Sequence, residues 1–370
     1  MTLTGARRVI VKVGSALLIK EENGAIRDGW MRALCADIAN MKASGTDVVI
    51  VSSGAIGVGR TVLGLGTRAL KLEEKQAAAA AGQIRLAHAW QEALAAHDLA
   101  VAQILLTPGD TEERRRHLNA RNTVESLLVL DALPLINEND TVATEEIRFG
   151  DNDRLAARVA QMIGADTLVL LSDIDGLYAA DPRKQPDAEF IPEVAELTPE
   201  ILSMAGEAAP GNSSGGMVTK LAAADIAMRA GCQVIIADGR ADHSLDNLGK
   251  EGRFTRFLPV ESSTRARKRW IAAAVSHAGA IAVDEGAVRA LKSGGSLLPA
   301  GIAAVEGDFD RGDTVIIHDP SGRRLGCGIS AYSAEDARLI AGRKSREIEG
   351  LLGYRGRDEI IHRDDLVLDD

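Results

Sequence analysis

A glycine-containing segment followed by a lysine carries the clearest chemical signal in this chain of 370 residues. It reads Asn212-Ser213-Ser214-Gly215-Gly216-Met217-Val218-Thr219-Lys220 and leads into an apolar-periodic stretch. Paired glycines let backbone N–H groups approach an anion closely, and the N-terminus of a helix favours negative charge. Met217 stands where a P-loop requires lysine, so the segment does not match that motif. A plain surface loop is the alternative, and a phosphate site on another scaffold is the prediction.

A second lysine, Lys12, lies inside the strand-like run Val9–Val13 and is followed by Gly14 and Ser15. A charge inside a buried strand is costly unless it is matched. Open α/β sheets bind ligands at the carboxyl ends of their strands, so the Lys12 ammonium group is expected to face phosphoryl oxygens. The alternative is an edge strand from which the lysine points to solvent.

Polar and small residues also gather where other predicted strands end. They are Ser52, Ser53, Gly54 and Ala55 after one strand, Asn137, Glu138, Asn139 and Asp140 after a second, Asp151, Asn152 and Asp153 at the start of a helix, and Ser172 and Asp173 after a third strand. Helix capping would explain one or two of these acids, whereas the carboxylates and amides at 137–140 and 151–153 together suit binding an ammonium group or orienting lysines. The junction after Ser52 resembles a cradle for a phosphate or a carboxylate. The glycines lack the G-x-G-x-x-G spacing of NAD sites, and no EF-hand or His–Glu metal motif is present. A Mg²⁺ ion would therefore be carried mainly by nucleotide phosphates, with no metal site in the protein itself.

Composition narrows the class of protein. The net charge of −10 and an aromatic content of 3% disfavour a general nucleic-acid or membrane binder. Three scattered cysteines form no pair motif, and the N-terminus lacks the apolar core of a signal peptide, which together predict a cytoplasmic location. The length predicts two domains.

Short apolar runs alternate with helical patterns through the first 260 residues. The predicted strands are Val9–Val13, Val48–Val51, Val101–Leu105, Leu133–Ile136, Leu168–Leu171 and Val234–Ala237. The predicted helices are Trp30–Met41, Leu72–His97, Arg114–Leu130, Arg154–Ile163 and Val218–Ala230. Continuous apolar strands between helices predict an α/β fold, a three-layer sandwich with a mainly parallel sheet.

The pattern changes beyond residue 260. The basic run Arg265–Arg269 is predicted to be a solvated connector. Short β-like pieces follow at Ile281–Val283, Ile302–Glu306, Thr314–His318 and Leu325–Ile329, with a hairpin turn at 319–322. The acidic residues 364–370 are predicted to be frayed. We therefore predict domains at 1–260 and 278–360.

Several of these segments, taken in order, resemble the amino acid kinase superfamily and, within it, the glutamate 5-kinase family. They are Val11-Lys12-Val13-Gly14-Ser15, Ser52-Ser53-Gly54-Ala55, Ile136-Asn137-Glu138-Asn139-Asp140, Gly150-Asp151-Asn152-Asp153 and Ser214-Gly215-Gly216-Met217-Val218-Thr219-Lys220. Lys75-Gln76, Gly82-Gln83 and Leu118-Asn119-Ala120-Arg121 also match. The segment from Ser296 to Ser333 is similar to a PUA domain, a small β-rich pseudobarrel.

The resemblance implies an enzyme that uses ATP to phosphorylate the γ-carboxylate of L-glutamate, the first step of proline biosynthesis. Lys12 and Lys220 would stabilise the transferring phosphoryl group, and Asp153 would hold both lysines. Glutamate would be bound by Ser53, Gly54, Ala55, Asp140, Asp151 and Asn152. ATP would be bound by Lys12, Ser172, Asp173, Ser214, Gly215, Gly216, Met217, Val218, Thr219 and Lys220. Ser214 replaces a threonine that is common in the family, and Asn212-Ser213 replaces a more apolar lead-in, although the hydroxyl group is retained.

The resemblance also implies feedback inhibition by proline and a homo-oligomer. Two alternatives stay open. One is another acid kinase, such as acetylglutamate kinase or aspartokinase, although an acetylated amine cannot pair with the carboxylates. The other is an RNA-binding protein led by the PUA-like tail. Residues 276–370 contain 12 Lys and Arg against 17 Asp and Glu, a balance of 12 − 17 = −5 that disfavours RNA binding.

Overall fold

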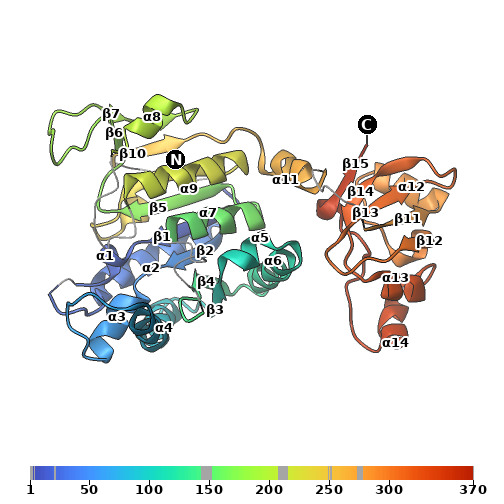
Figure 1. Cartoon of the computed structure of the whole chain (residues 1–370), viewed down its shortest axis with the longest axis horizontal. Helices are drawn as coiled ribbons and strands as arrows, with labels where there is room; N and C mark the ends of the chain where they lie inside the picture. Colours follow the sequence, from blue (N-terminus) through green and yellow to red (C-terminus); the bar gives the residue numbers. More distant parts are fainter. Residues whose placement is uncertain are drawn as a thin grey trace. The chain divides into compact units, whose positions relative to one another are not determined.

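A computed structural model describes residues 3, 5–20, 22–142, 152–206, 216–248, 250, 252–272 and 278–369. The chain divides into two compact units, Met1–Ser263 and Thr264–Asp370 (Figure 1). Within the described ranges, every helix is too short or too polar to cross a membrane.

The first unit is built on a sheet in which six neighbouring strands are parallel. Its order is β3-β4-β2-β1-β5-β9-β10-β8, and only the last two strands run against the others. The bounds are β1 Arg8–Val13, β2 Asp47–Ser52, β3 Val101–Leu106, β4 Leu133–Glu138, β5 Thr167–Ser172, β8 Glu193–Val194, β9 Gln233–Asp238 and β10 Phe254–Phe257. Since β1 pairs with β2 on one side and β5 on the other, the edge-strand alternative for Lys12 is wrong.

Helices cover both faces of this sheet, which confirms the predicted three-layer α/β architecture. On one face lie α6 (Arg114–Val129), α7 (Asn152–Ile163) and α9 (Met217–Arg229), and on the other lie α2 (Asp28–Ala43) and α4 (Leu72–Ala95) (Figure 1). Alternate residues of β1 divide between the two cores: Ile10 packs with α7 and α9, whereas Val9, Val11 and Val13 pack with α2 and α4. This two-residue period places Lys12 on the same face as Ile10.

The predicted strands and helices of this unit all form, within about two residues at each end, as is usual for element boundaries. The helix α3 (Ala55–Val62) was not predicted, because its glycines at 57 and 59 weaken helix propensity. The remaining elements are α1 Ser15–Leu18, α5 Pro108–Glu112, β6 Leu177–Tyr178, β7 Phe190–Ile191, α8 Pro199–Ser203 and α10 Ser244–Asn247.

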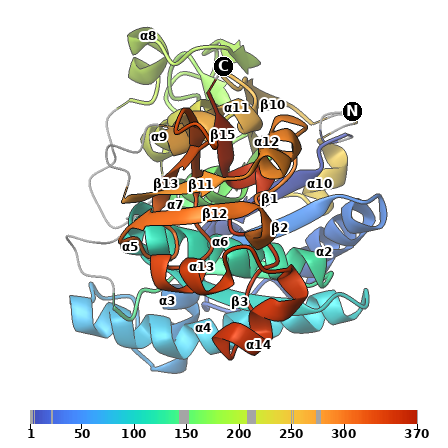
Figure 2. The same cartoon turned by 90° about the vertical axis from the view of Figure 1, so that its right-hand side faces the viewer.

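The second unit is a five-stranded sheet with its own apolar core, drawn in orange and red in Figure 2. The strand order is β12-β11-β13-β14-β15. The bounds are β11 Gly279–Val283, β12 Ile302–Gly307, β13 Thr314–His318, β14 Arg324–Ile329 and β15 Leu366–Leu368, with α12 Glu285–Lys292, α13 Ala334–Ile340 and α14 Ile348–Leu352. The predicted hairpin turn joins β13 and β14.

One prediction about this part of the chain was wrong and another holds only in part. Arg265, Lys268 and Arg269 of the basic run are exposed, as predicted, but the run lies in helix α11 (Ser263–Ala272), where Arg267 donates to the Asp364 carbonyl at 2.7 Å and pairs with Asp365. The acidic end is not frayed, because β15 pairs with β14 and Leu366 joins the core. Local composition did not predict the conformation of the basic run or of the acidic end, because contacts with residues far away in sequence decided both.

Candidate active site

Two lysines and one aspartate form a buried ionic cluster on the α7–α9 face of the sheet. Lys12 Nζ lies 2.5 Å from Asp153 Oδ1, and Lys220 Nζ lies 3.2 Å from Asp153 Oδ2. The exposed fractions are 6% for Lys12, 7% for Lys220 and 0% for Asp153. Two ammonium groups against one carboxylate leave one net positive charge, which suits an anionic ligand.

Each member of the cluster is placed by a regular element. Lys12 is the penultimate residue of β1, Asp153 is in the first turn of α7, and Lys220 is in the first turn of α9. Helix α9 begins after Gly216, whose N–H donates to Thr219 Oγ1 at 3.2 Å, and this hydroxyl also lies 3.2 Å from Asp153 Oδ2. The amino ends of two helices therefore meet at the carboxyl end of β1.

The lysines keep Asp153 ionised. Burial acts to raise the pKa of its carboxyl group, but the charges of Lys12 and Lys220 outweigh that effect and lower the pKa to about 2. The carboxylate is consequently a permanent anchor for both ammonium groups at neutral pH, and it has no role as a proton donor there.

Asn152, which precedes Asp153, links the cluster to the end of β2. Its Nδ2 lies 3.0 Å from the Ser52 carbonyl, 2.9 Å from Ser53 Oγ and 2.8 Å from Asn137 Oδ1. Gly54 follows with φ of 108°, a left-handed conformation that favours glycine, and Ala55 then begins α3. The structure thus brings Ser53, Gly54, Ala55 and Asn152 together beside the lysines.

The structure describes one of the two remaining residues predicted to bind glutamate. Asp140 lies two residues beyond the end of β4 and is half-buried. Asp151 lies outside the described residues.

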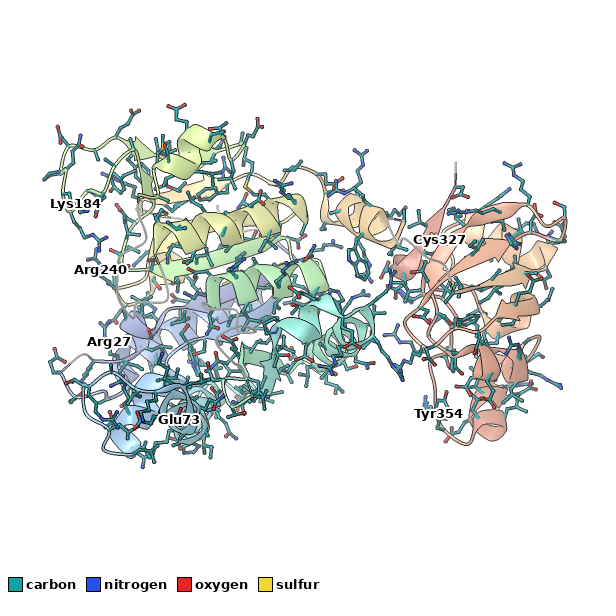
Figure 3. All side chains as sticks on the ribbon, in the orientation of Figure 1. Arg27, Glu73, Lys184, Arg240, Cys327 and Tyr354 are labelled. Carbon is teal, nitrogen blue, oxygen red and sulfur yellow. The ribbon has the colours of Figure 1, made fainter. Side chains whose placement is uncertain are left out.

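Two of the residues predicted to bind ATP, Ser172 and Asp173, lie at the same edge of the sheet, at the end of β5. Ser172 ends β5, its Oγ donates to Asp173 Oδ1 at 3.1 Å, and its carbonyl accepts from the Gly239 N–H at 2.8 Å. Figure 3 shows Lys184 and Arg240 at this edge. The Arg240 guanidinium pairs with Asp238 at 2.6 Å and also interacts with Asp173.

Part of the predicted phosphate segment can be placed. Gly216, Met217, Val218 and Thr219 form the cap and first turn of α9, next to Lys220. Ser214 and Gly215 lie outside the described residues. Among the described residues, no group of three or more His, Cys, Asp or Glu side chains is placed to hold a metal ion.

The sequence model of the amino acid kinase family matches residues 7–238, more than half of the chain and the whole of this cluster. The chain belongs to the amino acid kinase family. The model of the PUA domain matches residues 279–352. The chain is 61% identical to the glutamate 5-kinase of Paramagnetospirillum magneticum over 99% of both chains. It is 58% identical to the glutamate 5-kinase of Rhodospirillum rubrum, over 97% of this chain and 96% of the relative.

In this member of the amino acid kinase family, the structure adds residues that the sequence did not assign to the site. Gln83 on α4 accepts from Asn137 Nδ2 at 2.7 Å, and Trp90 on the same helix donates to Ser52 Oγ at 3.0 Å. The only sequence signal for these contacts was the Gly82-Gln83 pair, which resembles the family without indicating a role.

Proposed function

We propose that this chain transfers the γ-phosphoryl group of ATP to the γ-carboxylate of L-glutamate, producing glutamyl 5-phosphate and ADP. The observation that carries the proposal is the buried Lys12–Asp153–Lys220 cluster at the carboxyl edge of a parallel sheet. Relatives named glutamate 5-kinase, 57–61% identical over nearly the whole chain, support glutamate as the substrate. The reaction is the first step of proline biosynthesis.

The chemistry requires positioning and charge neutralisation more than acid–base catalysis. A γ-carboxylate oxygen forms a bond to the γ-phosphorus, and the bond from that phosphorus to the β–γ bridging oxygen breaks, so that ADP leaves with the electron pair. The carboxylate is already ionised at pH 7, so no general base is needed. Lys12 and Lys220 would offset the charge of the two anions as they meet.

The role proposed for Asp153 is to position the lysines. Without it, two ammonium groups would repel each other in a site shielded from water. Because one of its oxygens contacts each lysine, Asp153 holds both ammonium groups close together, beside the position proposed for the transferring group. We therefore expect its removal to impair turnover more than substrate binding.

The cluster fits ATP accompanied by Mg²⁺. Its net positive charge and the amino end of α9 suit phosphate oxygens, and Asp153 is already engaged by both lysines. The ion would be held mainly by the phosphates, where it supplies further charge neutralisation. Ser172, Asp173 and the segment 214–220 would bind the nucleotide.

The opposite side of the cluster is proposed to bind glutamate. Ser53, Gly54, Ala55, Asp140, Asp151 and Asn152 would hold the amino acid, with carboxylates pairing to its ammonium group. Proline shares the α-carboxylate and a positively charged amine, so it would compete in the same region. We also propose that the protein forms a homo-oligomer. The second unit would have a structural role and would not bind RNA.

Trapping of the acyl phosphate tests this function. Purified protein with ATP, Mg²⁺ and hydroxylamine should form the hydroxamate from glutamate, and little from N-acetylglutamate or aspartate. Release of ADP should match hydroxamate formation. Equal or greater product from N-acetylglutamate would contradict the assignment, as would glutamate-independent release of ADP.

A further inference from the structure

We propose that Gln83 is a positioning residue for the amino acid substrate, acting through the side-chain amides of Asn137 and Asn152. The inference rests on the proposed function, and it adds a residue from helix α4 to the glutamate side of the site. Gln83 supports the affinity for glutamate by accepting from Asn137 Nδ2 and so holding the Asn137 side chain in place against Asn152, without taking part in phosphoryl transfer.

The orientation of the Asn137 amide follows from its neighbours. Its Oδ1 accepts from the N–H of Glu138 at 2.9 Å, and a backbone N–H can only donate. Its Nδ2 must then face away, toward Gln83 Oε1 at 2.7 Å. Asn137 is 2% exposed, so a flipped amide would leave buried polar groups unsatisfied, which is costly.

The same logic continues to Asn152. Because Oδ1 of Asn137 is fixed by its other contacts, the group that meets it at 2.8 Å must be the donor Nδ2 of Asn152. That nitrogen also contacts Ser53 Oγ and the Ser52 carbonyl. A planar amide carries its oxygen on the opposite side, so the donor and acceptor faces that Asn152 presents are both determined. The Glu138 N–H thus sets the amide orientations, and Gln83 completes the series of contacts by accepting from Asn137 Nδ2.

Helix α4 is suited to act as a rigid support for this series of hydrogen bonds. A Cβ atom at Gly82 would lie 1.8 Å from the Ala55 carbonyl oxygen, and one at Gly59 would lie 1.7 Å from that of Ala78. Helices α3 and α4 therefore touch backbone to backbone, which only glycine permits at these two positions. Trp90, on the same helix, donates to Ser52 Oγ at 3.0 Å and gives α4 a second contact with the site. Glu73, labelled in Figure 3, lies in the first turn of this helix.

The test is a double-mutant cycle on the full chain. Gln83→Met keeps a long, unbranched, helix-forming side chain but removes the acceptor oxygen. We expect it to raise the KM for glutamate about 10-fold, the effect of losing one partly buried hydrogen bond, and to leave the KM for ATP and kcat within about 2-fold. Asn137→Ala should also raise the glutamate KM. Adding Gln83→Met to Asn137→Ala should then change the glutamate KM little further, because Asn137→Ala has already removed the side chain through which Gln83 acts.

Gln91→Met is the matched control, since Gln91 is exposed on the same helix, and it should behave as the wild type. Independent effects that multiply in the double variant would overturn the inference. So would an equal loss in kcat or in ATP affinity, or a Gln83→Met protein without a cooperative melting transition. Failure of the proposed function itself is seen separately, as absence of glutamate-dependent turnover in the wild type.

Discussion

Lys12 and Asp153 form an ion pair of 2.5 Å between two side chains that are almost wholly withdrawn from water. The pair joins the central strand of the sheet to the first turn of α7. Such a buried pair contributes little net stability, because desolvating both charges offsets their attraction. The cost of burying this pair therefore indicates a functional role for the cluster.

Replacing either lysine should damage turnover more than substrate binding. Lys12→Ala or Lys220→Ala removes a positive charge from the position where negative charge develops in the transition state, and kcat should fall on the order of 100-fold or more. Steady-state assays with both substrates measure this. Lys250, an exposed lysine paired with Asp246, provides the control, and Lys250→Ala should keep wild-type kcat. Near-full turnover in Lys220→Ala would remove this residue from the mechanism.

The ionisation of Asp153 should make the free energy of unfolding depend on pH in the acid range. Its folded-state pKa, about 2, is below the unfolded value of about 3.9. The part of the stability that depends on its ionisation is therefore present above pH 4 and is lost as the pH falls toward 2. Urea unfolding of the wild type and Asp153→Asn between pH 5 and pH 2.5 should show curves that converge at low pH. A difference that stays constant across this range would mean that the carboxylate is not held ionised by the lysines.

Replacing Asn152 or Asp140 should weaken the binding of glutamate and leave the binding of ATP unchanged. Asn152→Ala or Asp140→Ala is expected to raise the glutamate KM strongly, leave the ATP KM little changed, and weaken inhibition by proline. If Asn152 serves only the start of α7, its replacement should instead lower stability by about 1 kcal/mol and leave glutamate affinity unaltered. Melting temperature measured beside the two KM values distinguishes these results.

The first unit should retain glutamate kinase activity without the second. All described members of the proposed site lie before residue 221, and the apolar cores of the two units share no residue. A chain ending at Ser263 keeps the bond from the Val260 N–H to the Met228 carbonyl at 3.1 Å. It should remain folded and turn over glutamate. A folded truncated protein without activity would show that the second unit is needed for the chemistry.

The sequence by itself determined most of the helices and strands of the first unit and the side chains available for chemistry, although it did not predict helix α3. Continuous apolar runs between amphipathic stretches predicted the strands and helices, because each depends on a local period that matches the geometry of one element. Lys12, Asp153 and Lys220 could be selected in the same way, since polar residues that follow buried strands or open helices gather at one edge of a parallel sheet.

Tertiary structure decided which of these groups contact each other. Nothing near Asn152 in sequence indicates that its amide meets Ser53 and Asn137, and nothing near Gln83 indicates that it faces Asn137. Likewise the pairing of β15 with β14 overrode an acidic composition that had predicted a frayed end. Hydrogen bonds and ion pairs act over a few ångströms, so partners distant in sequence are specified only once packing has brought their elements together.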